Sequence, residues 1–311
     1  MTTGVLVMAY GTPQGPDDIA AFYTDIRRGH PPSPRQLDDL ERRYNAIGGT
    51  SPLAQRTASQ LGALRVALDV LSPEEFVVYY GAKHSHPRIE DAVRTMSSDG
   101  VSRMVGLVLA PHYSALSVGE YIQRARAKAS EVALPSGFVE RWGDDPLLIG
   151  LLSDRVEKAV SSLGSSAQDH LEVIFTAHSL PARIKDLGDP YEDELRQTAD
   201  LVARRTGLSH YRIGWQSAGK TTDPWLGPDI LELIPSLVDE GAKAVVVCAA
   251  GFTSDHLEVL YDLDIEAKGL ATSLGVAFAR TESLNDDPML ARLLARRVAD
   301  ARDTIIDAKP A

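Results

Sequence analysis

The sequence predicts an α/β protein built from two open, mostly parallel sheets. Eight short runs rich in Val, Ile and Leu alternate with longer stretches of helical spacing, a pattern typical of βαβ units. The order of these runs repeats once along the chain. The length of 311 residues suits one large domain or two of about 150 residues.

The expected elements alternate regularly from the start of the chain to its end. The expected strands are Gly4–Ala9, Phe76–Tyr80, Met104–Ala110, Gly137–Arg141, Leu171–Thr176, Tyr211–Trp215, Ala244–Ala249 and Val276–Ala279. The expected helices are Pro87–Met96, Val118–Glu131, Pro146–Ser161, Pro190–Arg205, Asp255–Leu270 and Pro288–Ile306. Eight strands allow one closed barrel or two open sheets.

An internal repeat favours two sheets. Residues 5–13 read VLVMAYGTP and residues 173–181 read VIFTAHSLP, so Tyr10 and His178 hold equivalent places. Residues 107–114 (LVLAPHYS) correspond in the same way to residues 246–253 (VVCAAGFT). Several matches in one order indicate duplication. We expect domains at 1–145 and 146–311, with a helical insertion over 14–72 in the longer first half.

Composition and charge exclude several classes of protein. Hydrophobic residues make up 44% and charged residues 24%, as in soluble globular proteins. The net charge of −11 opposes nucleic acid binding, which needs a basic face. Cys248 is the single cysteine, which excludes an intrachain disulfide. Short apolar runs and the lack of a signal peptide predict a cytoplasmic protein without stable membrane insertion.

Chemically active side chains gather where the expected strands end. Tyr10 follows the first strand, and five of the eight histidines lie in such turns: His84, His86, His112, His178 and His256. Histidine is the side chain that titrates near neutral pH and the commonest metal ligand. A single histidine here is equally explained by a turn hydrogen bond, whereas the whole set indicates a site.

An acidic row follows the last long strand. Glu258, Asp262 and Glu266 stand four residues apart, which places them on one face of a helix. The row fits a solvated acidic face and a binding place for a divalent cation equally well. Dinucleotide, P-loop, nucleophile-elbow and zinc-protease motifs are absent from the sequence.

Five segments resemble the ferrochelatase family. They are VMAYGTP (7–13), YNAIGGTSPL (44–53), TAHSL (176–180), WQSAGKTTDPWLG (215–227) and GFTSDHLEVLYD (251–262). The similarity spans about residues 4–280 and is strongest to the soluble Gram-positive type. It implies two Rossmann-like, chelatase-type domains with a porphyrin in the cleft between them. It also implies insertion of ferrous iron into coproporphyrin III to give coproheme in haem biosynthesis, with release of two pyrrole protons.

The resemblance also implies roles for particular residues. His178 and Glu258 match the family's catalytic, metal-handling pair, and Tyr10 matches a phenol that faces the iron. Residues that match porphyrin-binding positions are Tyr10, Arg27, Arg43, Tyr44, Ser51 and Tyr121. Arg43, Asp262 and Glu266 match an outer site for a hydrated divalent ion such as Mg²⁺.

On the same resemblance, Fe²⁺ is a substrate and no cofactor is tightly bound. No iron–sulfur cluster is expected, because Cys248 stands alone. We expect a monomer that binds porphyrin and iron, with transient contacts to neighbouring enzymes of haem synthesis.

Alternative functions are a protoporphyrin IX ferrochelatase, a sirohydrochlorin chelatase and a non-catalytic porphyrin or haem carrier. Tyr10 favours coproporphyrin over protoporphyrin. A carrier would not need both His178 and Glu258. A periplasmic-type binding protein is opposed by the missing signal peptide.

Overall fold

The chain folds into two compact units, which we describe separately. The computed structural model describes residues 2–164 and 170–305. Unit 1 comprises Met1–Leu109, Ser117–Trp142 and Asn285–Ala311, and unit 2 comprises Ala110–Leu116 and Gly143–Leu284. Within the described ranges, no helix has the length and apolar character needed to cross a membrane.

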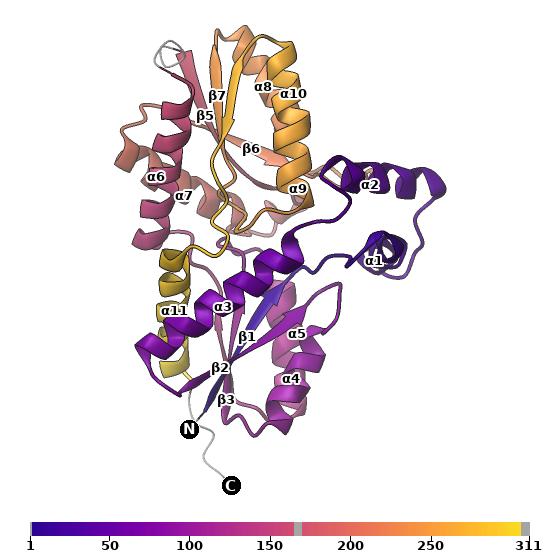
Figure 1. The fold of residues 1–311 in the computed structure, drawn as a ribbon, viewed down its shortest axis with the longest axis vertical. Helices are drawn as coiled ribbons and strands as arrows, with labels where there is room; N and C mark the ends of the chain where they lie inside the picture. Colours follow the sequence, from indigo (N-terminus) through magenta and orange to yellow (C-terminus); the bar gives the residue numbers. More distant parts are fainter. Residues whose placement is uncertain (1, 165–169, 306–311) are drawn as a thin grey trace. The chain divides into compact units, whose positions relative to one another are not determined.

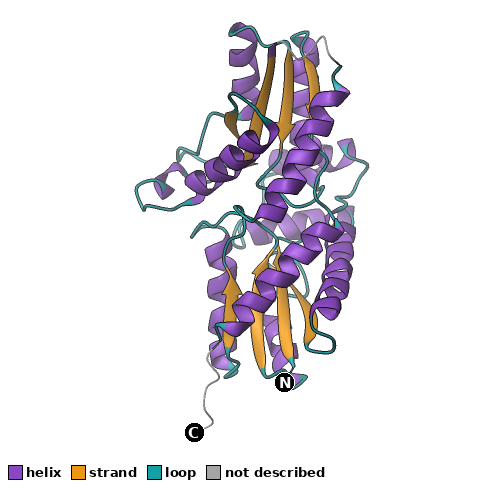
Figure 2. Ribbon diagram, turned by 90° about the vertical axis from the view of Figure 1, so that its left-hand side faces the viewer, coloured by secondary structure: helices purple, strands orange, loops and turns teal. Residues whose placement is uncertain are grey.

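Unit 1 is built on a four-stranded parallel sheet of order β2-β1-β3-β4. The strands are β1 (Thr3–Ala9), β2 (Phe76–Ala82), β3 (Arg103–Val108) and β4 (Ser136–Val139). All residues of the central strand β1 are buried, because helices cover both faces of the sheet (Figures 1 and 2). This burial explains why β1 is a continuous apolar run.

Two helices cover each face of this sheet. α4 (Ile89–Ser98) and α5 (Val118–Glu131) pack on one face. α3 (Leu53–Leu71) and α11 (Pro288–Asp303) pack on the other. Between β1 and α3 lie η1 (Pro16–Asp18), α1 (Ile19–Ile26) and α2 (Pro34–Ala46). The reciprocal bonds between Ser33 and Gln36 at its first turn fix where α2 begins.

Unit 2 repeats the strand order of unit 1 in a second parallel sheet, β6-β5-β7-β8. Its strands are β5 (Leu171–His178), β6 (Arg212–Gln216), β7 (Ala244–Cys248) and β8 (Ala277–Arg280). The helical elements are α6 (Pro146–Ser162), η3 (Ala182–Ile184), α7 (Tyr191–Thr206), α8 (Ile230–Asp239), α9 (Leu257–Val259), η4 (Leu260–Ala267) and α10 (Lys268–Ser273). The prediction of two open sheets is confirmed.

The structure differs from the predicted division at residue 145 in two places. Residues 110–116 belong to unit 2, and residues 285–305 return to unit 1. The second difference arises because the apolar stripe of α11 packs against α3, β3 and β4. α11 ends at Asp303, and its expected end at Ile306 lies outside the described residues. Within the predicted insertion 14–72, α3 also packs on β2, as a crossover helix between parallel strands does.

Replacing a buried leucine of α11 should destabilise unit 1. Leu293 is fully buried, so Leu293→Ala should cost about 2–5 kcal/mol of unfolding free energy. Met289→Ala, at a position of the same helix that is 38% exposed, should cost less than about 1 kcal/mol. Urea titration of both variants measures the difference. Equal losses would show that α11 is not held by its apolar stripe.

Candidate active site

The carboxyl edge of the unit 2 sheet brings His178 and the loop after β7 together. His178 is the last residue of β5 and pairs in parallel register with Gln216. Parallel strands end at the same edge, so side chains that follow them are neighbours. A Cβ atom on Gly251 would lie 2.4 Å from the Ala177 Cβ. Glycine therefore lets this loop pass directly beside the end of β5.

A backbone carbonyl fixes the tautomer of His178. The imidazole Nδ1 lies 2.5 Å from the Ser179 carbonyl oxygen, which can only accept a hydrogen bond. Nδ1 therefore carries the hydrogen, and Nε2 of the neutral ring keeps its lone pair. The Tyr191 hydroxyl donates to the His178 carbonyl at 3.1 Å, which fixes the backbone on the other side. A positioned base with a free lone pair results.

Glu258 stands between two imidazoles. Its Oε1 lies 3.7 Å from His178 Nε2, and its Oε2 lies 3.6 Å from His256 Nε2. The His178 and Glu258 side chains are both 34% exposed. When the His178 ring carries its hydrogen on Nδ1 alone, Nε2 and the carboxylate are both electron-pair donors and do not bond each other. The gap between them suits a proton or a metal cation.

His256 is the less exposed member of this group. Its Nδ1 donates to the Ser254 carbonyl oxygen at 3.0 Å, so its Nε2 is the atom that faces Glu258. Burial lowers the pKa of His256, but the adjacent Glu258 carboxylate outweighs burial and raises the pKa above its ordinary value. The sequence placed His256 in a strand-end turn and within the segment GFTSDHLEVLYD, but assigned it no role.

The acidic row begins in α9 and continues in a π-helix. η4 holds both Asp262 and Glu266, so the expected α-helix over 255–270 is wrong in its middle part. π-helical turns are rare in proteins, and many of those that occur lie at functional sites. Asp262 is only 6% exposed, and the Ser217 hydroxyl donates to its Oδ2. Ser217 itself has a left-handed backbone, with φ 59°. Among the described residues, no three His, Cys, Asp or Glu side chains form a group that could hold a metal ion.

In unit 1, Tyr10 marks the same edge of the sheet. It directly follows β1 and is 40% exposed. Its ring lies 4.6 Å from the His84 ring and 6.3 Å from the Phe22 ring, measured between centroids. An aromatic wall thus supports an accessible phenol at the end of β1.

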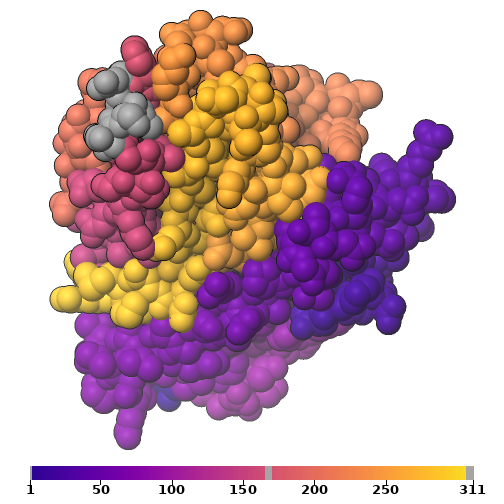
Figure 3. Space-filling view, turned by 45° about the horizontal axis from the view of Figure 1, so that its top comes forward, coloured from indigo at the N-terminus to yellow at the C-terminus, as the bar shows by residue number. Residues whose placement is uncertain are grey.

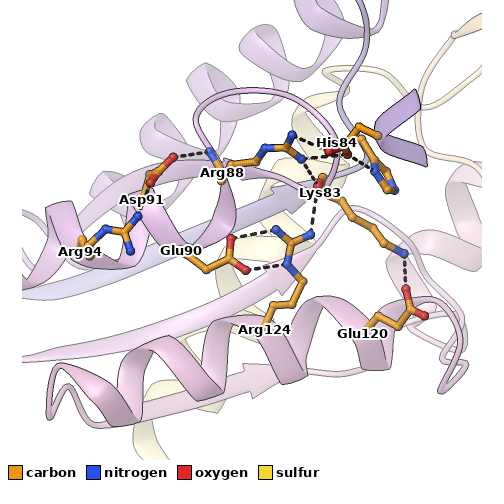
Figure 4. A network of polar contacts seen from close by, with 9 residues as sticks. Lys83, His84, Arg88, Glu90, Asp91, Arg94, Glu120 and Arg124 are labelled. Atoms are coloured by element: carbon orange, nitrogen blue, oxygen red, sulfur yellow. Dashed lines mark hydrogen bonds and ion pairs between the residues drawn. The ribbon is translucent and has the colours of Figure 1, made fainter. Parts of the chain in front are cut away.

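A polar network holds the turn after β2 (Figure 4). Asp25 accepts two bonds from Arg88, at 2.8 and 3.0 Å, and lies 2.7 Å from His84 Nδ1. The bonds from Arg88, opposed by burial and assisted by His84, lower the pKa of Asp25 to about 2. Burial lowers the pKa of His84, although Asp25 opposes this. Because Asp25 lies in α1, the network fastens α1 to the sheet.

Two cations complete the network. Arg124 binds both oxygens of Glu90, at 2.7 and 2.8 Å, and donates to the Lys83 carbonyl at 3.0 Å. The Lys83 ammonium pairs with Glu120 and lies 5.3 Å from the centroid of the Tyr121 ring. No sequence motif pointed to Asp25, Arg88 or Arg124, because their partners lie far away along the chain.

The remaining predicted residues also lie in unit 1. Arg27 follows the end of α1 and donates to the His30 carbonyl, while Arg43 in α2 pairs with Asp39 at 3.3 Å. The three other predicted porphyrin-binding side chains are buried: Tyr44, Ser51 and Tyr121. Arg43 belongs to unit 1 and both acidic residues of the outer site to unit 2, so their grouping remains a prediction.

Glu258→Gln should lower the pKa of His256, because an uncharged amide no longer opposes burial. With a raised folded-state pKa, protonated His256 stabilises the native fold below its ordinary pKa of about 6.5. That contribution disappears as pH rises through the higher folded-state value. The stability difference between the native chain and Glu258→Gln should therefore shrink over this range. NMR titration of the imidazole measures the pKa, and an unchanged value would exclude Glu258 as the cause.

Comparison with known proteins identifies the family. The family model described as Ferrochelatase matches residues 2–302. A coproporphyrin III ferrochelatase of Geobacillus thermodenitrificans is 44% identical over 97% of this chain and 98% of its own length. The Bacillus subtilis protein of the same name is 45% identical over 94% and 95%, and a ferrochelatase of Herpetosiphon aurantiacus 41% over 94% and 96%.

Solved structures agree on the fold. The sirohydrochlorin chelatase SirB of Bacillus subtilis subspecies spizizenii, in complex with cobalt, has a TM-score of 0.58 at 12% identity. That match covers 98% of this chain and 97% of SirB. At this identity the likeness concerns the fold alone. With the family match spanning nearly the whole sequence, the chain belongs to the ferrochelatase family.

Proposed function

We propose that this chain inserts Fe²⁺ into coproporphyrin III to give coproheme, with release of two pyrrole protons. The carrying observation is the lone pair of His178 Nε2, which faces the Glu258 carboxylate across 3.7 Å. Relatives of 44% and 45% identity that are named coproporphyrin III ferrochelatases support the choice of porphyrin. A single buried free cysteine, Cys248, is compatible with work in the reducing cytoplasm.

The proposed roles of His178 and Glu258 follow from the chemistry of insertion. A free porphyrin must lose two N–H protons before its nitrogens can bind a divalent ion. A positioned imidazole and a carboxylate provide two basic groups for these protons. The same two atoms can hold the incoming ion, since their 3.7 Å separation is spanned by two bonds of about 2.1 Å each. Ligands without thiolate suit an ion that must be released into the ring.

The proposed porphyrin contacts come from unit 1. Propionates are anionic, so a chain of net charge −11 must place cations where they bind. Arg27 and Arg43 are proposed for this task, because guanidinium groups bind carboxylates in a paired geometry. The exposed phenol of Tyr10 is proposed to face the iron. The buried side chains are proposed to shape the porphyrin site: Tyr44, Ser51 and Tyr121.

An outer divalent-ion site at Asp262 and Glu266, with Arg43 beside it, is also proposed. Both acidic residues lie in η4 and supply the oxygen ligands that Mg²⁺ prefers. Asp262 already accepts a bond from Ser217, which orients the carboxylate. With two carboxylates, the ion would keep several waters, as Mg²⁺ usually does.

Insertion is tested by anaerobic mixing of the protein with Fe²⁺ and a porphyrin, followed by porphyrin absorption. We expect faster insertion into coproporphyrin III than into protoporphyrin IX. Preference for protoporphyrin IX would keep the enzyme and change its substrate. Tight binding without insertion would identify a carrier and contradict the proposal.

His178→Ala and Glu258→Gln should each lower the insertion rate by about 10²–10⁴-fold, the usual contribution of a positioned acid or base. Porphyrin affinity, measured by fluorescence quenching, should survive. His86→Ala provides the matched control, because the His86 side chain is 82% exposed. Loss of porphyrin binding in either site variant would assign that residue a structural role.

Asp262→Asn and Glu266→Gln should weaken the response of the insertion rate to added Mg²⁺. They remove oxygen charge from the proposed outer site while leaving His178 and Glu258 in place. Rates measured over a Mg²⁺ titration give the response separately from the rate without Mg²⁺. If the Mg²⁺ response and the rate without Mg²⁺ fall equally, these carboxylates take part in the insertion reaction itself.

A further inference from the structure

An apolar groove runs between α3 and α11 in unit 1. Its volume is about 660 Å³. Small and apolar side chains of both helices line it, Leu71 among them, together with Arg292 and Arg296. Figure 3 shows the two helices bordering each other on one face of the molecule, α11 in yellow and α3 in violet. None of these residues has a part in the proposed iron insertion.

The lining forms parallel rows at four-residue spacing. Alanines make the floor in two pairs, 63 with 67 on α3 and 291 with 295 on α11. Val66 and Val70, which are 66% and 81% exposed, make one wall. Rows at this spacing are the ridges and grooves into which another helix packs. Each side of the groove covers about 12 Å, or two helical turns.

The opposite wall is basic. Arg292 and Arg296 stand one turn apart on α11, and both are exposed. Within the described ranges, neither side chain has an ion pair. Two cations without an ion pair among the described residues thus stand across the groove from two exposed valines, on a chain whose net charge is −11. An apolar stripe with acidic residues along one edge would complement the alanine floor, the valine wall and the arginine wall together.

We propose that this groove binds an acidic amphipathic helix of a partner protein. Apolar side chains of the partner helix at i, i+3, i+4 and i+7 would pack on the alanine floor. Carboxylates along one edge of its apolar stripe would pair with Arg292 and Arg296. A flat membrane surface fits a concave groove of two turns less well. A second copy of this chain would bring its own Arg292 and Arg296 to the interface, where like charges would repel.

The test uses a designed peptide of Leu, Ala and Glu with that pattern, and a twin with Lys in place of Glu. Binding is measured by fluorescence anisotropy and by NMR of valine and leucine methyl groups. We expect the acidic peptide to bind and to shift the methyl signals of Val66, Val70 and Leu71. Arg292→Glu/Arg296→Glu should weaken binding at least about tenfold.

Two further variants separate the groove from general charge effects. Val66→Ser/Val70→Ser should also weaken binding without unfolding, because both side chains are exposed. Arg204→Glu/Arg205→Glu on α7 changes the net charge equally and should leave binding intact. Iron insertion should be unchanged in all three double variants, so failure here is distinct from failure of the proposed function.

Several results would overturn the inference. They are no binding of the acidic peptide, equal binding of its lysine twin, and equal binding to Arg292→Glu/Arg296→Glu. Groove-dependent binding to phosphatidylglycerol vesicles in place of the peptide would assign the face to membranes. Groove-dependent self-association in sedimentation would assign it to a second copy of the chain.

Discussion

Parallel pairing of β5 with both of its neighbours is the constraint on which the unit 2 site depends. Because β6, β5 and β7 run in one direction, all three deliver their following residues to one edge. β5 delivers His178, β6 delivers Gln216, and β7 leads through the Gly251 loop to Glu258. The Gln216 side chain donates to the Glu258 backbone carbonyl at 3.3 Å, which ties two of these strand ends together.

Within that frame, backbone carbonyls prepare the imidazoles. Ser179 fixes the Nδ1 hydrogen of His178, and Ser254 does the same for His256. Both Nε2 atoms consequently face the one carboxylate of Glu258. Backbone acceptors cost nothing in side-chain entropy and do not titrate, so they hold this arrangement over a wide pH range. The pair is therefore ready for a proton or a cation before either arrives.

Unit 1 uses the same edge differently. Its strand ends carry an exposed phenol and a dense network of ion pairs rather than an open acid–base pair. Asp25 anchors α1 through Arg88 and His84, and Arg27 lies directly after that helix. The proposed propionate-binding cation thus depends on a partly buried ion network for its position.

Local pattern in the sequence was sufficient to locate the sheets. All eight strands were expected within a few residues of their observed bounds, because parallel strands buried on both faces are continuous apolar runs. Tyr10 and His178 could be singled out as candidate site residues because each stands where an expected strand ends. The return of α11 to unit 1 could not be predicted, because the apolar face of a helix does not indicate which other element it packs against. Local spacing likewise did not reveal the π-helix at Asp262 or the Asp25–Arg88 pair, which depend on tertiary contacts.

The most direct test of this account is the tautomer of His178. Nitrogen-15 NMR of the histidine-labelled chain at mildly alkaline pH distinguishes the two ring nitrogens. The account predicts that the neutral His178 ring carries its hydrogen on Nδ1 and has a bare Nε2. The one-bond hydrogen–nitrogen coupling at His178 Nδ1 should remain in variants of other turn histidines, such as His86→Ala. A hydrogen on Nε2 would occupy the lone pair that faces Glu258, so Nε2 could neither accept a proton nor bind iron, which would contradict the proposed roles.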